Sequence, residues 1–400
     1  MLELRLRILD QDPVVAPISP PAPTFTERAW LAYGFRPFFL AGSGAAVVLM
    51  LLWLFMLAGR GPLAQLDPIQ WHAHEMLFGF GGAVVAGFLL TAVPNWTGLP
   101  TPRQGGLGFL LVLWLLGRAG SWWGGPGAWI DLLFLPALGI SLAGPLGRSG
   151  QLRNLVFLPV LGMLWSANLL FWMQPQQRGL ALSLTVYGLL LLIALIGGRV
   201  IPFFTERALA GHQPLRAGWL EGFCLVGLGL SAVVENWSGV SPLTKLLVLG
   251  ATALFHCLRM FGWGSVRMAR VPLLWVLYLG YGFLPLGLLL RGLAWSGWGS
   301  LSAGTHALTA GCIGLMCLGM MSRVALGHTG RELRPARLTV ASFILLGAAG
   351  ITRSLVPFCW PQLYGHALWC AGALWCLAFL SFFVIYWPIL TSPRADGKPG

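Results

Sequence analysis

The chain has 400 residues, of which 57% are hydrophobic and only 9% are charged. Soluble proteins contain roughly 25% charged residues, so this composition excludes a soluble globular enzyme. The net charge of +13 comes from 25 Lys and Arg residues against 12 Asp and Glu residues. In a soluble chain such an excess would suggest nucleic-acid binding, whereas in a membrane chain the positions of the basic residues indicate topology.

Residues 1–37 are rich in proline, carry four arginines and contain no apolar run, which predicts a retained cytoplasmic tail and not a cleaved signal peptide. Residues 38–390 hold twelve apolar stretches, each too long for a membrane β-strand of about 9 to 11 residues. We therefore predict an all-α, polytopic membrane protein of about twelve transmembrane helices, followed by a short tail over 391–400. The predicted stretches are 38–58, 73–97, 107–123, 128–147, 153–173, 180–203, 217–239, 242–262, 271–290, 301–325, 338–356 and 362–388.

The basic residues divide unequally between the two sides that twelve helices define. Of the 25 Lys and Arg residues, 19 fall in the tails and the even-numbered loops, and 6 fall on the other side. By the positive-inside rule, this bias predicts that both termini are cytoplasmic. The six exceptions are Arg60, Arg118, Arg178, Lys245, Arg291 and Arg353.

Four histidines and a glutamate are expected near the outer end of the bundle. His72 and His74 precede Glu75 where the second helix begins, and because they lie about 200° apart on a helix they face opposite ways. One could ligate haem and the other a second metal or Glu75. His306 is expected at the depth of His74, so we predict His74 and His306 as a haem pair, with His366 as a reserve or copper ligand. The alternative is an interfacial histidine pair with Glu75 at a favourable helix start.

Two further histidines are expected near the cytoplasmic face. His256 lies beside Arg259, and His328 lies between Arg323 and Arg331. Arginines beside a histidine suit the carboxylates of haem propionates. The alternative is that these arginines only mark the cytoplasmic ends of their helices.

The remaining polar residues are predicted to be less informative. The seven cysteines form no C-x-x-C pair, which gives no support for c-type haem, and we interpret them as packing residues. His212 is predicted to be a solvated loop residue. Asp67, Asp131 and Glu235 are predicted to be interfacial, which leaves Glu75 as the one carboxylate expected inside the outer layer.

Seven blocks in order along the chain resemble the NnrS family. They are 33–39 (YGFRPFF), 71–76 (WHAHEM) with 86–92 (AGFLLTA) and 95–98 (NWTG), 198–205 (GRVIPFFT), His256 with Arg259 and Trp263, 306–311 (HALTAG), 321–331 (MSRVALGHTGR), and 393–400 (PRADGKPG).

The resemblance implies a multi-pass protein of the bacterial inner membrane that contains haem, here taken as haem b, and copper. It also implies a link to nitric oxide metabolism, denitrification and resistance to nitrosative stress. The candidate cofactor-binding residues inside the blocks are His72, His74, Glu75, His256, Arg259, His306, Arg323, His328 and Arg331, whereas His212 and His366 lie outside them.

The leading hypothesis is a haem and copper redox protein that binds or turns over nitric oxide at the outer histidines, with Glu75 carrying protons. Whether it is an enzyme, such as a haem-copper oxidoreductase, stays open. The expected partners are the lipid bilayer, nitric oxide or a related small molecule, and quinol or another electron donor, but no nucleic acid. The alternatives are a transporter of haem, copper or a small solute, and a haem-based sensor or assembly factor.

Overall fold

The computed structural model describes residues 28–61 and 64–398. Most of the tail predicted for residues 1–37, and the last two residues of the tail predicted for 391–400, lie outside these ranges. Within the described part, twelve helical segments are long and apolar enough to cross a membrane, which confirms the predicted all-α membrane fold. The second segment begins at Pro68, five residues before the predicted start, so His72 lies inside the helix.

The elements follow one another with short connections. The two π-helical elements are η2 and η5, and the other η elements are 3₁₀ turns. In chain order they are η1 (Ala29–Leu31), α1 (Phe35–Leu57), α2 (Pro68–His74), η2 (Glu75–Gly81), α3 (Gly82–Thr97), α4 (Gln104–Trp123), α5 (Gly127–Arg148), α6 (Leu152–Leu155), α7 (Phe157–Met173), η3 (Pro175–Gln177), α8 (Arg178–Ala208), α9 (Gly218–Asn236), α10 (Pro242–Trp263), η4 (Val266–Arg270), α11 (Pro272–Trp295), α12 (Leu301–His306), η5 (Ala307–Ile313), α13 (Gly314–His328), α14 (Arg337–Cys359), η6 (Pro361–Leu363) and α15 (Tyr364–Thr391).

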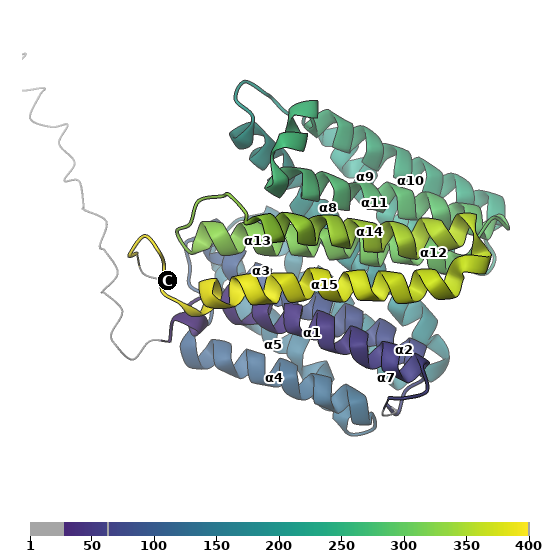
Figure 1. The fold of residues 1–400 in the computed structure, drawn as a ribbon, viewed down its shortest axis with the longest axis horizontal. Coiled ribbons are helices and arrows are strands. Elements are labelled where there is room, and N and C mark those ends of the chain that lie inside the picture. The colour runs from purple at the N-terminus through teal and green to yellow at the C-terminus, as the bar shows by residue number, and fades with distance from the viewer. Residues whose placement is uncertain (1–27, 62–63, 399–400) are drawn as a thin grey trace, which may run out of the picture.

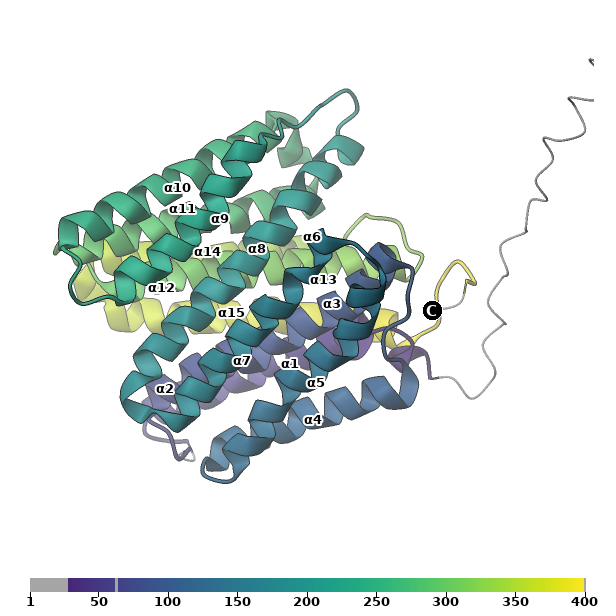
Figure 2. The same cartoon turned by 180° about the vertical axis from the view of Figure 1, so that it is seen from behind.

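The helices run roughly side by side, and the start of α1 lies at the same end of the bundle as the end of α15 (Figures 1 and 2). We call this the termini end and the opposite one, where α2 and α12 begin, the far end. The continuous segments α2–η2–α3 and α12–η5–α13, which we call the two central segments, lie at the centre together with α11. Of their apolar windows 83%, 72% and 72% are buried, against 33% for α4, α9 and α10. The cavities described below lie around these central segments.

Helices α4 and α5 pack with their backbones in direct contact. A Cβ atom added to Gly120 would overlap the backbone carbonyl of Gly127, and one added to Gly127 would overlap that of Gly120. Small residues allow such close approach between membrane helices. This contact holds α4 and α5 together as a hairpin. Arg118 lies near the end of α4 and Asp131 near the start of α5, both toward the far end.

We expect Gly120→Ala to force these two backbones apart. The substitution should lower stability by about 1–3 kcal/mol, as overpacking does elsewhere. The matched control is Gly139→Ala on α5, where an added Cβ meets no atom within 4 Å. Unfolding of the two detergent-solubilised variants by increasing SDS would measure the difference, and equal midpoints would contradict the prediction.

Candidate functional site

The two central segments place their histidines in the same way. Helix α2 is capped by Asp67, whose carboxylate accepts from the N–H groups of Ile69 and Gln70, and it ends at His74. Helix α12 is capped by Ser300 and ends at His306. A π-helical segment follows directly in both cases, η2 after His74 and η5 after His306. Such π segments are frequent at functional sites because the extra residue in the turn redirects nearby side chains.

A cavity of about 330 Å³, which we call the histidine cavity, lies between these two segments and α8 at the far end. His72 and His306 both line it, together with apolar residues such as Met76 and Leu308. His74 does not line it. The structure therefore confirms that His72 and His74 face different ways, and it brings His306 to the same cavity as His72.

The ring nitrogens of the two cavity histidines suit metal ligation. The Nδ1–H of His306 donates to the carbonyl oxygen of Ser302 at 2.7 Å. This bond fixes the neutral tautomer that leaves the Nε2 lone pair free. The His72 ring stacks on Trp53 with 3.9 Å between ring centres. Its Nδ1 is buried and has no hydrogen-bond partner among the described residues. Both imidazoles thus have a nitrogen available to a ligand.

An arginine beside His306 forms no ion pair with a carboxylate of the described residues. Arg353 is 6% exposed, and its Nη2 donates to the hydroxyl of Tyr364 at 3.1 Å. The same nitrogen lies 3.5 Å from the hydroxyl of Ser302, the residue that binds His306. Its Nη1 is buried without a hydrogen-bond partner in the part of the chain that the structure describes. Because an unpaired buried charge is costly, this guanidinium suits an anionic ligand group.

Arg291 lines the cavity, which Arg353 does not, and its charge is already neutralised. Its Nε lies 2.9 Å from both carboxylate oxygens of Glu235, and its Nη1 donates to Thr305. Tyr187 and Trp295 also donate to that carboxylate. Glu235 lies in the last turn of α9 and is 4% exposed, so this carboxylate is buried within the bundle. Of the two arginines, Arg353 is the one without a carboxylate partner among the described residues, and its Nη1 is available to a bound anion.

His74 belongs to a separate buried network. Its Nδ1 lies 2.9 Å from the carboxylate of Glu75, and its Nε2 lies 3.0 Å from Asn168 and 3.3 Å from Asp131. Arg118 donates to both carboxylates, at 2.8 Å to Glu75. With both ring nitrogens protonated, His74 can donate a hydrogen bond on each side of its ring. The positive charges of His74 and Arg118 then balance the negative charges of Glu75 and Asp131. Asp131 lies near the start of α5 and is 2% exposed, so it too is buried within the bundle.

At the termini end, His256 and Arg259 are held by hydrogen bonds within the bundle. His256 Nδ1 lies 2.7 Å from the hydroxyl of Tyr281, to which Arg259 also donates at 2.8 Å. The carboxylate of Glu221 accepts two further bonds from Arg259. The carboxylate of Glu221 therefore neutralises the charge of Arg259, and the guanidinium is not available to a ligand in the cavity.

The other residues predicted at this end lie around a loop that the carboxyl-terminal segment covers. Arg394 donates to the backbone carbonyl of His328 at 3.0 Å. The guanidinium of Arg323 packs over the ring of Phe204 at 3.7 Å, and Arg331 donates to a backbone carbonyl two residues before it at 3.4 Å. These residues do not line the cavity that His72 and His306 share. The bond from Arg394 to His328 joins the end of α13 to the carboxyl-terminal segment.

The two histidines outside the resembling blocks lie away from the cavity. His366 is exposed at the start of α15. The Nε2 atom of His212 lies 3.0 Å from the backbone carbonyl of Trp263, in a connection at the termini end. Among the described residues, no group of three or more His, Cys, Asp or Glu side chains is arranged to hold a metal ion.

The sequence did not lead us to Arg353, the arginine best suited to bind an anionic group of a ligand. It was counted only as one of the six basic residues on the outer side. A usable signal was present, because Arg353 falls inside the apolar stretch 338–356, and an ionisable residue within a membrane segment is by default a candidate functional residue.

Comparison with known proteins gives one family and no individual relative. The family model described as NnrS protein matches residues 29–394, nearly the whole chain. No curated protein matches it. The matched region includes both central segments, the cavity histidines and Arg353. The chain therefore belongs to the NnrS family.

Proposed function

We propose that this protein is a haem-containing redox protein of the bacterial inner membrane that acts in nitric oxide metabolism. The observation that carries the proposal is the far-end cavity, where two imidazoles with available nitrogens lie beside an unneutralised arginine. A membrane protein of the NnrS family with this cavity is consistent with the role that the sequence resemblance implies.

The residues around the cavity fit haem b. His72 and His306 would hold the iron from two different helices, and Arg353 would bind a propionate carboxylate through its unpartnered Nη1. The stacking of His72 on Trp53 and the bond from His306 to Ser302 fix both rings before any ligand arrives. Haem bound there would supply one-electron transfer and affinity for a diatomic ligand.

The same residues do not fit a preformed copper site. Copper proteins hold the ion with several nitrogen or sulfur ligands, and the described residues contain no group of three or more suitable side chains. His72 and His306 are already assigned to haem, and His366 is exposed. We therefore propose no step that uses copper.

The orientation of the protein in the membrane determines the side on which the cavity lies and the donors that can reach it. With the termini end in the cytoplasm, as the charge bias predicts, the histidine cavity lies toward the periplasm. A quinol in the bilayer is the donor class that we propose, since the cavity lies within membrane-spanning segments.

We expect the purified full-length protein to contain about one haem per chain. Its reduced spectrum should show the bands of a six-coordinate haem b with two histidine ligands. Quantitative haem extraction and reduced-minus-oxidised spectra would measure this, with protein from haem-deficient cells, reloaded with haem, as the control. Nitric oxide would have to replace one of the two histidines on a haem held in this way, so its addition to the reduced protein should change the spectrum. Absence of a Soret band from both preparations would overturn the proposal.

A further inference from the structure

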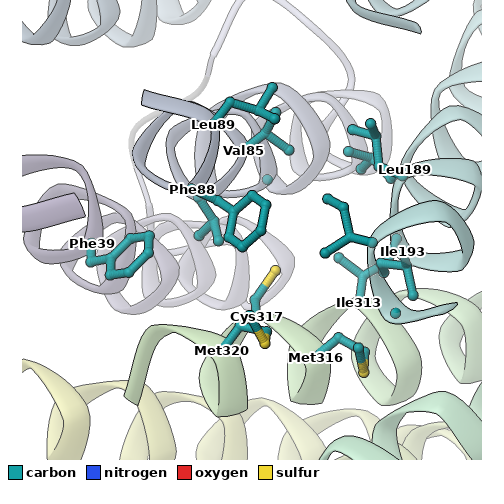
Figure 3. Close-up of a pocket in the computed structure, with 15 residues that line it drawn as sticks. Phe39, Val85, Phe88, Leu89, Leu189, Ile193, Ile313, Met316, Cys317 and Met320 are labelled. Carbon is teal, nitrogen blue, oxygen red and sulfur yellow. The ribbon is translucent and has the colours of Figure 1, made fainter. Parts of the chain in front are cut away.

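A second cavity, of about 80 Å³, lies next to the histidine cavity on its termini side. Side chains from the two central segments and from α8 converge on it, among them Val85 and Phe88 of α3, Ile193 of α8, and Met316 and Cys317 of α13 (Figure 3). Phe39 of α1 closes another side. We call it the central cavity.

The lining of the central cavity is apolar. No charged side chain lines it, and the thiol of Cys317 is its most polar side-chain group. A buried water molecule needs two to four polar partners, so water is poorly held there. Apolar cavities of about 150 Å³ stay dry and bind benzene or xenon. At 80 Å³ the central cavity is about half that size, which suits a single xenon atom or a diatomic molecule but not an aromatic ring.

The central cavity and the histidine cavity are consecutive along the same helices. On the second segment the lining passes from Phe80 to Gly81, and on α8 it passes from Tyr187 to Leu189. Ile313, the last residue of η5, lines both cavities and is the one lining residue that they share. Its side chain therefore separates the two spaces, and a small molecule moving between them passes it.

We propose that the central cavity holds a small uncharged diatomic gas and delivers it past Ile313 to the histidine cavity. The delivery step rests on the proposed function, because it requires a gas-binding group between His72 and His306. The gas-holding step does not rest on it, because it follows from the size and apolar lining of the central cavity. Nitric oxide meets both requirements, since it is diatomic and uncharged.

The gas-holding step can be tested with xenon on the full chain in nanodiscs. We expect wild-type protein to add a saturable shift to the ¹²⁹Xe resonance, and Val85→Phe to abolish it by filling the central cavity. The matched control is Val226→Phe on α9, whose side chain is 69% exposed and which should keep the wild-type shift. Cys317→Leu fills the cavity from another helix if Val85→Phe does not fold. A wild-type shift in a folded filling variant would overturn this step.

The delivery step is tested by the rate at which carbon monoxide rebinds to the reduced protein after a light flash. We expect Val85→Phe and Cys317→Leu, whose residues line only the central cavity, to slow bimolecular rebinding by roughly tenfold, an increase in barrier of about 1.4 kcal/mol, without changing the equilibrium spectrum. Val226→Phe should rebind at the wild-type rate. Unchanged rates in both filling variants would overturn delivery, whereas loss of haem with an intact xenon shift would overturn only the proposed function.

Discussion

Arg118→Ala is expected to destabilise the protein by about 3–5 kcal/mol, the cost of removing one partner from a buried ion pair. The arginine donates to Glu75 and Asp131, whose side chains are 0% and 1% exposed. Without it, two buried carboxylates share only the charge of His74. Asn168 and Trp172 donate to Asp131, but neutral donors do not replace the lost charge.

The matched control is Arg216→Ala. This arginine also forms an ion pair, with Glu206 at 2.7 Å, but the two side chains are 56% and 52% exposed. Exposed pairs contribute at most about 1 kcal/mol, so the control should unfold close to wild type. SDS-induced unfolding of the solubilised proteins, followed by circular dichroism, would measure both. Equal midpoints for the two variants would contradict the assignment of a buried charge network.

A double variant separates charge from packing. In Arg118→Ala/Asp131→Asn one negative charge is removed with the positive one, so His74 again balances the remaining carboxylate. We expect the double variant to be more stable than Arg118→Ala alone, although it keeps the same cavity at Arg118. A double variant less stable than Arg118→Ala would show that side-chain packing at Asp131 contributes more to stability than the balance of charges.

The number and limits of the helices could be predicted because both depend on local properties of the sequence. A run of about 20 apolar residues is sufficient to span a bilayer. The predicted and observed limits differ by five residues at the end of the sixth helix, which continues to Ala208, and at the start of the second, where Asp67 caps a helix that begins at Pro68. A polar cap lies outside an apolar run, so hydropathy alone does not find it.

The opposite orientation of His72 and His74 was also predictable, because the angle between them follows from helix geometry. Which of them faces the cavity was not predictable, since it depends on how the second segment is rotated against α8 and α12. Asp131 shows the same limit. Its position near a helix end suggested an interface, but it is buried because Arg118, on another helix, points to it. Such partners become neighbours only when the helices pack.

The proposed haem site predicts which histidine substitutions remove the cofactor. His72→Ala and His306→Ala should each lower the haem content per chain by about tenfold or more, since even outer partners of a metal ligand contribute 10–100-fold to metal affinity. Exogenous imidazole should restore part of the spectrum in both variants, because it supplies the missing nitrogen in the space that alanine leaves. Haem extraction and low-temperature absorption spectra would measure the two effects.

His74→Gln distinguishes this assignment from the pairing of His74 with His306 that the sequence suggested. Both ring nitrogens of His74 contact oxygen atoms of its own network, so the variant should lose stability but keep the haem of the folded fraction. His212→Ala, in a connection at the termini end, serves as the control. Loss of the low-spin spectrum in folded His74→Gln, with retention in His72→Ala, would show that the sequence pairing is right and that the cavity assignment is wrong.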